Sequence, residues 1–183
     1  MSFQVSDRSG SLVNTPLWDP SYSFGEALVP GAAPTTIVQL QGAASTKVRV
    51  KRIALTLTAG TATGASTYTL NLRSTAASGG TSATKTPASS DSSQAAAGAV
   101  LKSFTAAPTA GTLTAAVGAQ QMGLVLQTGA GGGTVQAIWE YSTRGDRPIV
   151  LSSASEFLTV DSSTALAAGQ VLSYEIKWEE GSN

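Results

Sequence analysis

The feature of this sequence that most constrains its fold is a series of short segments with the two-residue period of a β-strand. In the clearest of them, residues 172–178, large apolar side chains occupy every second position and polar side chains lie between them. Such alternation gives a strand one buried and one solvated face. Further segments of this kind lie at residues 35–40, 46–58, 68–72, 121–127, 134–141, 148–151 and 156–160. Many short strands joined by small polar loops predict an all-β fold, an antiparallel β-sandwich of jelly-roll-like type.

The segment 46–58 changes its phase part-way along. Val48 and Val50 occupy one set of alternate positions, whereas Ile53, Leu55 and Leu57 occupy the other. A β-bulge, or a strand that passes from one sheet to another, produces such a slip.

Helix signals are scarce and the remaining segments resemble loops. The best candidate is 94–102, which is rich in alanine and preceded by Asp91 and Ser93 as possible caps, but Val100 and Phe104 form no helical stripe, so a strand fits equally well. Residues 74–93 are close to low complexity and predict a long solvent-facing excursion with a short ordered piece inside it. The glycines of 129–133 predict the turn of a hairpin between the strands on either side.

Residues 1–34 differ from the rest of the chain and predict an extended arm. They carry four of the seven prolines, which disfavour both helix and central strand. Trp18, Tyr22 and Phe24 lie among them, and aromatic residues of this kind need a surface to pack on, either in the same domain or on a neighbouring subunit. The predicted organisation is therefore an arm at 1–34 and a single sandwich domain at 35–183.

The chain contains no cysteine and no histidine. These two residue types supply most protein nucleophiles, the usual acid–base group near neutral pH and most zinc ligands. We therefore expect no catalytic residues, no metal site and no cofactor, and the protein is not predicted to be an enzyme. A hydrolase that uses two carboxylates survives this reasoning. Its candidates are not singled out by their spacing, and most carboxylates of this kind are solvated: Glu140, Asp146, Glu156, Asp161 and Glu175.

The charges balance, with 11 basic and 11 acidic residues. A neutral chain has no overall field that would attract nucleic acid or an anionic membrane, and no segment is apolar for long enough to span a bilayer as a helix. A basic stripe on one strand, Lys47, Arg49 and Lys51 with Arg52 beside them, could meet an acidic partner surface, although a charged outward face is ordinary in a sandwich. The tripeptide Arg144-Gly145-Asp146 most simply makes a turn. The first residues lack the pattern of a secretory signal, which predicts synthesis in the cytoplasm.

Several segments in a fixed order carry a resemblance to a known group of proteins. They are KVRVKRIAL at 47–55, RSTAASGGT at 73–81, Asp91 before an alanine tract, FTAAPTAG at 104–111, and Arg144-Gly145-Asp146 leading into Ile149-Val150-Leu151. Over about residues 45 to 180 the chain resembles small proteins encoded in the structural gene region of tailed bacteriophages. The resemblance implies a capsid decoration (cement) protein of β-sandwich type that assembles as a homotrimer on the capsid exterior.

The function expected from this resemblance is structural. The partners would be the major capsid protein and further copies of the chain, with no nucleic acid, membrane or small-molecule substrate, and the protein would stabilise contacts between capsomers. Since area and copy number supply the binding energy in such an assembly, each contact can be modest. The expected interface residues are Trp18, Tyr22, Phe24, Arg49 and Lys51, the aromatic members because such residues are enriched at binding hot spots. The alternative is a receptor- or carbohydrate-binding module of a phage fibre or adhesin, for which 139–141 offers a faint aromatic signal, although alternation predicts that at least one of its aromatics is core.

Overall fold

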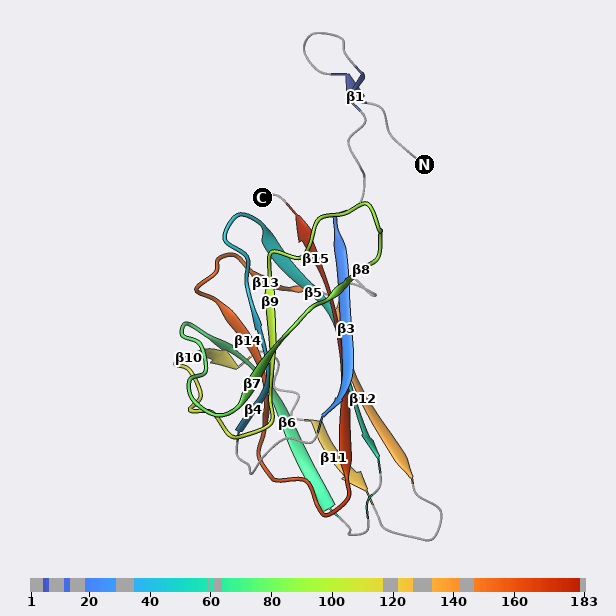
Figure 1. The fold of residues 1–183 in the computed structure, drawn as a ribbon, viewed down its shortest axis with the longest axis vertical. Helices are drawn as coiled ribbons and strands as arrows, with labels where there is room; N and C mark the ends of the chain where they lie inside the picture. The colour runs from blue at the N-terminus through green and yellow to red at the C-terminus, as the bar shows by residue number, and fades with distance from the viewer. Residues whose placement is uncertain are drawn as a thin grey trace.

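The fold is an antiparallel β-sandwich, seen in a computed structural model that describes residues 5–6, 12–13, 19–28, 35–58, 60, 64–116, 122–126, 133–141 and 147–181. The described part contains strands and loops and no helix, which confirms the predicted all-β class (Figure 1). Each strand pairing is antiparallel.

Two sheets make the sandwich. Sheet I runs in the order β10 (Leu113–Ala116), β6 (Gly64–Arg73), β14 (Phe157–Ser162), β4 (Thr35–Gln41), β9 (Val100–Phe104), β7 (Ser82–Lys85), and β11 (Met122–Leu126) also pairs with β6. Sheet II runs in the order β12 (Thr134–Glu140), β5 (Lys47–Thr58), β15 (Val171–Gly181), β3 (Ser21–Leu28), β8 (Ala88–Ser89), and β13 (Ile149–Leu151) also pairs with β5. The short strands β1 (Val5–Ser6) and β2 (Leu12–Val13) pair with each other and with neither sheet.

The hydrophobic core lies between the two sheets and follows the alternation of the sequence. On β15, Leu172, Tyr174, Ile176 and Trp178 are almost fully buried, as the sequence predicts. Trp178 packs against Tyr22 with ring centroids 5.9 Å apart. The largest fully buried side chains from the other strands are Ile37, Leu40, Ile53, Leu55, Leu57, Tyr68, Leu70, Leu101, Leu151 and Leu158.

The phase slip in 46–58 is a β-bulge. Lys177 of β15 lies opposite Arg52 and Trp178 opposite Val50, so Lys51 is the extra residue on β5. The bulge lies where the other neighbour of β5 changes, because β12 pairs with residues 52–58 and β13 with residues 48–50. It returns the apolar side chains of both halves of β5 to the core.

Three expectations from the sequence need correction. The strand β3 lies inside the predicted arm yet pairs with β15 along its whole length, since Pro20 and Pro30 flank the strand without interrupting it. For 94–102, which fits a helix and a strand equally well in sequence, the helix is wrong: residues 94–99 form a loop, and the strand alternative holds from Val100, where β9 begins. The strands beside the glycine run do not form a hairpin with each other, because β11 pairs with β6 in sheet I and β12 with β5 in sheet II.

The predicted excursion crosses from one sheet to the other. Its strand β7 pairs with β9 in sheet I, and β8, which begins three residues after β7, pairs with β3 in sheet II. In Figure 1 this green segment passes across the side of the sandwich in front of β3. The excursion therefore closes one open side of the sandwich, and its two short strands are the ordered piece that the sequence predicts.

Candidate functional site

The outer face of sheet II, the face turned away from the core, is the candidate functional surface. At one end it carries a set of ion pairs between neighbouring strands. Lys51 lies 2.8 Å from Glu179, and Arg52 lies 3.1 Å from Glu175. Arg49 lies 2.6 Å from Asp19, two residues before β3 begins. We call these three pairs the charge ladder.

The charge ladder changes the interpretation of the basic stripe. Arg49, Lys51 and Arg52 do share the outer face, as the alternation predicts, but acidic side chains of the same molecule contact all three. Exposed pairs of this kind contribute about 0–1 kcal/mol each to stability. The three pairs offset the charges of Arg49, Lys51 and Arg52, and Lys177 shares Glu175 with Arg52, so the stripe attracts a distant acidic surface less than its basic residues alone would.

The other half of the same face is uncharged, and on β12 the exposed Gln136 lies opposite Thr56 and donates to its hydroxyl at 3.2 Å. Neighbouring strands contribute Ala27, Thr56 and Ser173, which lie side by side in the register of β3, β15 and β5. Ile138 of β12, which is 38% exposed, borders this area, whereas Val150 of β13, which is 37% exposed, lies opposite Arg49 at the charge ladder. An uncharged face of this kind can bind a partner through buried area and shape complementarity.

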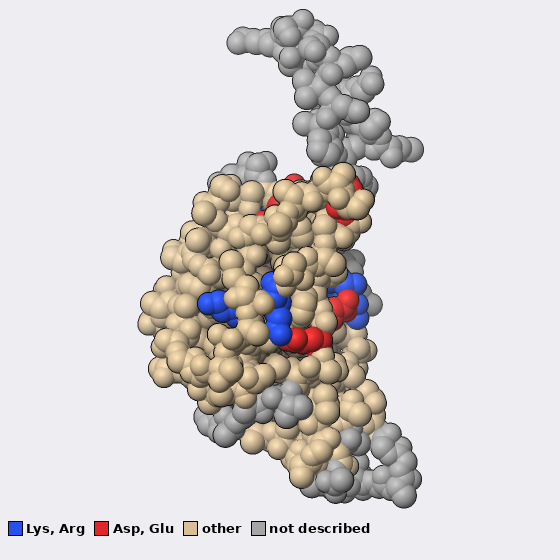
Figure 2. Space-filling view, in the orientation of Figure 1, with Lys and Arg blue, Asp and Glu red and all other residues tan. Residues whose placement is uncertain are grey.

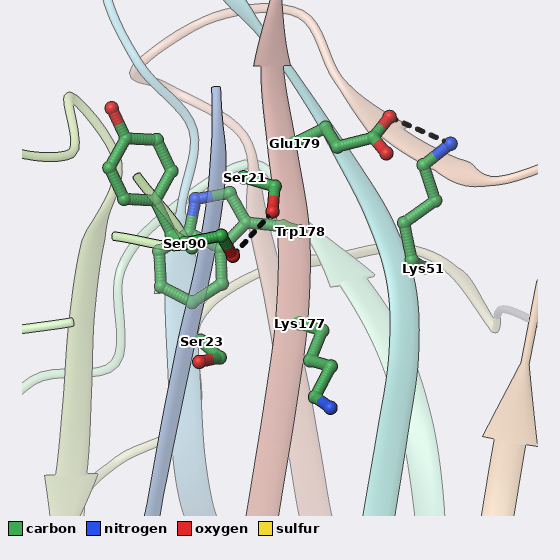
Figure 3. A pocket seen from close by; sticks show the side chains of 8 residues that line it. Ser21, Ser23, Lys51, Ser90, Lys177, Trp178 and Glu179 are labelled. Carbon is green, nitrogen blue, oxygen red and sulfur yellow. Dashed lines mark hydrogen bonds and ion pairs between the residues drawn. The ribbon is translucent and has the colours of Figure 1, made fainter. Parts of the chain in front are cut away.

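A shallow hollow of about 250 Å³ lies between the charge ladder and the β3 edge (Figure 3). Its lining includes Ser21 and Ser90, whose hydroxyl oxygens are 2.7 Å apart, and the Lys51–Glu179 pair. Lys177, which also lines it, lies 3.0 Å from Glu175. The serines contact each other and no general base, so this arrangement does not activate a nucleophile.

Of the predicted aromatic interface residues that the structure describes, one is a core residue and the other is half-buried. Tyr22 is 4% exposed and its hydroxyl donates to the carbonyl of Ala95, 2.9 Å away, so it is a core residue. Phe24 is half-buried and packs against Tyr174. Trp18 and the tripeptide Arg144-Gly145-Asp146 lie outside the described residues. The predicted interface set is therefore not brought together on one described surface.

The aromatic residues at 139–141, which suggested a sugar site, pack in or against the hydrophobic core. Trp139 is 4% exposed, and Tyr141 is half-buried and packs against the core. Sugar-binding sites need exposed aromatic faces. Every aromatic side chain among the described residues is buried or half-buried. The alternation that predicts a buried aromatic at 139–141 is confirmed.

A cross-sheet ion pair that sequence reasoning missed lies beneath the β7–β8 crossing. The ammonium of Lys85 lies 2.6 Å from a carboxylate oxygen of Glu26, and the hydroxyl of Tyr174 donates to the other oxygen at 3.0 Å. Lys85 also lies 6.0 Å from the centroid of the Phe24 ring. Figure 2 shows that this side of the molecule is largely uncharged, that its basic side chains lie across the middle with acidic side chains beside them, and that further acidic side chains lie near the top. The pair fastens sheet I to sheet II at the side that the excursion closes.

The surroundings of Glu26 and Tyr174 shift their pKa values in opposite directions. Burial by itself raises the pKa of Glu26, but the hydrogen bonds from Lys85, Ser103 and Tyr174 and the charge of Lys85 together hold it below its ordinary value. Burial, and then the charge of Glu26 and the hydrogen bond to it, raise the pKa of Tyr174 far above its ordinary range. Glu26 therefore stays ionised and Tyr174 stays neutral in the folded protein.

Glu26→Gln is expected to destabilise the protein at pH 7 and to remove part of its acid sensitivity. We expect a loss of about 1–3 kcal/mol, because charge-assisted hydrogen bonds are replaced by weaker ones. Since the folded pKa of Glu26 lies below the ordinary value of 4.5, the unfolded chain takes up a proton first as the pH falls. The stability gap between wild type and variant should therefore narrow below about pH 4.5, as measured by urea unfolding at several pH values. Glu140→Gln, at an exposed position, is the control, and a pH-independent gap would contradict the assignment.

A second buried ion pair lies on the side of sheet I away from the core. Arg73 of β6 and Asp161 of β14 form a salt bridge with side chains only 10% and 17% exposed. Asp161 also accepts hydrogen bonds from Asn71 at 2.6 Å and Thr36 at 2.8 Å. Arg73 donates to Thr159 at 3.1 Å. Asp161, one of the carboxylates that the sequence analysis took to be solvated, is thus a structural member of a buried polar network.

The loops on either side of β7–β9 cover this network. The backbone of Ser78 exchanges hydrogen bonds of 2.9 and 2.8 Å with that of Thr109, and the N–H of Ala77 donates to Gln39 at 2.7 Å. Arg73 donates to the carbonyl of Gly111. A side chain at position 111 would place its Cβ against the carbonyl oxygen of Thr75. Only glycine allows the two loop segments to approach so closely.

A buried carboxylate at the end of β15 holds the loop before β9. Glu180 is 5% exposed and accepts hydrogen bonds from the backbone N–H groups of Gly98 at 2.8 Å and Ala99 at 3.0 Å. The indole N–H of Trp178 donates to the same carboxylate at 3.0 Å. The sequence carried a signal for this position, because Glu180 continues the buried phase of 172–178.

Within the described ranges, no group of three acidic side chains lies close enough together to hold a metal ion. The same ranges contain no helix capable of crossing a bilayer. In comparisons with known proteins, no family model, no curated protein and no solved structure matches the chain.

Proposed function

We propose that the protein is a structural virion component, a decoration (cement) protein that binds the outer surface of a tailed-phage capsid and stabilises contacts between capsomers. It acts through area, shape and copy number. The proposal takes its partner, the major capsid protein, from the sequence resemblance, and its binding surface from the structure.

The observation that carries the proposal is the outer face of sheet II. One half carries the charge ladder, and the other half is uncharged, with Ser173 between Ala27 and Thr56. A surface of this kind suits a broad contact with another protein surface. It supports neither capture of a small ligand nor long-range electrostatic attraction.

Ser173→Arg is expected to reduce occupancy on purified capsids by about tenfold or more at limiting protein concentration, equivalent to about 1.4 kcal/mol. Ser173 lies opposite Thr56 and Ala27, in the middle of the uncharged half, and an arginine there would hold a partner surface away. The measurement is the ratio of bound protein to capsid protein after sedimentation of the particles.

Thr84→Arg is the matched control, because Thr84 is exposed on β7 at the edge of sheet I. Its occupancy should equal that of wild type. Equal occupancy for the two arginine variants would overturn the assignment of the binding face. Electron microscopy of native particles tests the function itself: density at threefold or quasi-threefold positions of the capsid supports decoration, whereas density only at the tail would support the fibre module.

A further inference from the structure

The strand β3 has a backbone edge that is only half covered. On the side away from β15, β8 pairs with Tyr22 and Ser23 and then ends. The N–H of Ser90 donates to the carbonyl of Ser21 at 2.9 Å, so the odd-numbered residues of β3 direct their backbone groups toward this edge. Gly25 and Ala27 are exposed, and among the described residues nothing forms a hydrogen bond with their outward N–H and C=O groups.

A hollow lies beside this edge, where β8 ends. It has a volume of about 530 Å³ and is lined by Ser23, Phe24, Gly25, Thr86, Ala88 and Glu175. The charged groups around it are already paired, Glu26 with Lys85 and Glu175 with Arg52 and Lys177. The free strand edge lies beside the Phe24 ring and beside charges that are already paired. Such an edge can bind an uncharged extended peptide, mainly through backbone hydrogen bonds.

The chain itself contains such a peptide. The segment 9–17 carries no charged residue and includes the strand β2 with Leu12 and Val13. In Figure 1 the β1–β2 pair lies beyond the end of the sandwich, and it joins neither sheet. A two-stranded hairpin by itself is marginally stable in water, so these strands gain most from adding to a larger sheet.

The geometry favours addition to another molecule. The N-terminal segment enters β3 at its Ser21 end, where β8 already occupies the edge. Along this edge, β8 lies between Ser21, where the chain's own N-terminal segment joins β3, and the free positions Gly25 and Ala27. The corresponding segment of a second copy can approach the open end of β3 directly.

We propose that the segment 9–17 of a second copy adds as a strand to the free edge of β3 at Gly25 and Ala27, and that copies of the chain associate through this exchange. This exchange deepens the proposed function by naming how the copies join. Its role on a capsid rests on that proposed function. The exchange itself requires no capsid, so purified protein tests it separately.

The experiment compares the masses of four purified chains by sedimentation velocity over a wide range of concentration. The full chain should form species larger than the 18.4 kDa of one copy. A chain without residues 1–18 lacks the donor strand and should stay monomeric. Ala27→Pro lacks the outward N–H of the acceptor edge, a substitution that edge strands tolerate, and should also stay monomeric. Ala27→Ser keeps the N–H and should behave as the full chain does.

Mixing supplies the decisive result. The truncated chain still has an acceptor edge, and Ala27→Pro still has a donor strand, so together they should form a one-to-one complex that neither forms alone. Circular dichroism checks that each variant is folded. The proposal is overturned if the truncated chain associates as the full chain does, if the two variants fail to complement each other, or if the folded full chain is monomeric throughout.

Discussion

Arg73→Met is expected to lower the free energy of unfolding by about 3–5 kcal/mol, the usual cost of removing one partner from a buried ion pair. The methionine fills much of the space of the arginine but leaves the carboxylate of Asp161 without its cation. Asn71 and Thr36 still donate to that carboxylate, yet neutral donors compensate only part of a buried charge. Urea unfolding followed by tryptophan fluorescence measures the loss.

Arg52→Met is the matched control for Arg73→Met. Arg52 is also paired with an acidic residue across neighbouring strands, but the side chains of Arg52 and Glu175 are 28% and 36% exposed. Its loss should therefore cost no more than about 1 kcal/mol. Adding Asp161→Leu to Arg73→Met should restore part of the stability, because the unpaired charge is removed. Similar losses for the two methionine variants would show that burial does not set the strength of the Arg73–Asp161 pair.

Glu180→Leu is expected to cost about 3 kcal/mol or more. The variant leaves the N–H groups of Gly98, Ala99 and Trp178 without their acceptor. Ala99 and Trp178 are buried, and each buried donor without a partner costs about 1–3 kcal/mol, whereas the exposed Gly98 can turn to water. The effect should also be local, because amide hydrogen exchange at Gly98 and Ala99 would become faster relative to β9. Urea unfolding and hydrogen exchange measure the two effects.

The neighbouring residue provides the control for Glu180. Glu179 lies on the opposite face of β15, where its side chain is 33% exposed and pairs with Lys51. Glu179→Leu should change stability by no more than about 1 kcal/mol and leave the exchange of Gly98 unaltered. If the two leucine variants were equally stable, Glu180 would not be the residue that holds the loop.

Alternation in the sequence predicts most of the strands and their buried faces. It places the apolar residues of 172–178 in the core, and the phase slip between Val50 and Ile53 indicates either a bulge or a change of sheet, which the strand register resolves as a bulge at Lys51. These features are local, since a side chain's face follows from its position along one strand. The same alternation continues to Glu180, so a buried carboxylate could have been predicted there.

The candidate site depends more on contacts between distant segments. Arg49, Lys51 and Arg52 are outward-facing as the sequence predicts, but their acidic partners come from β15 and from Asp19. Asp161 is buried because loops near residues 77 and 111 cover it, and nothing near Asp161 in the sequence indicates that cover. Tyr22 is a core residue for a similar reason, because β15 supplies Trp178 beside it.

The sequence by itself determined the class of fold, the number of residues each strand can bury and the chemistry that the chain lacks, because periodicity and composition are properties of the chain alone. The tertiary structure decided which strands pair, which charges are neutralised and which edge is left open. Those outcomes depend on where the sheets place residues that lie far apart in the chain. The strand β3 is the clearest case, because it lies in sheet II although the sequence places it in the arm. Its free edge beyond β8 is defined by its pairing with β15 on one side and with β8 on the other.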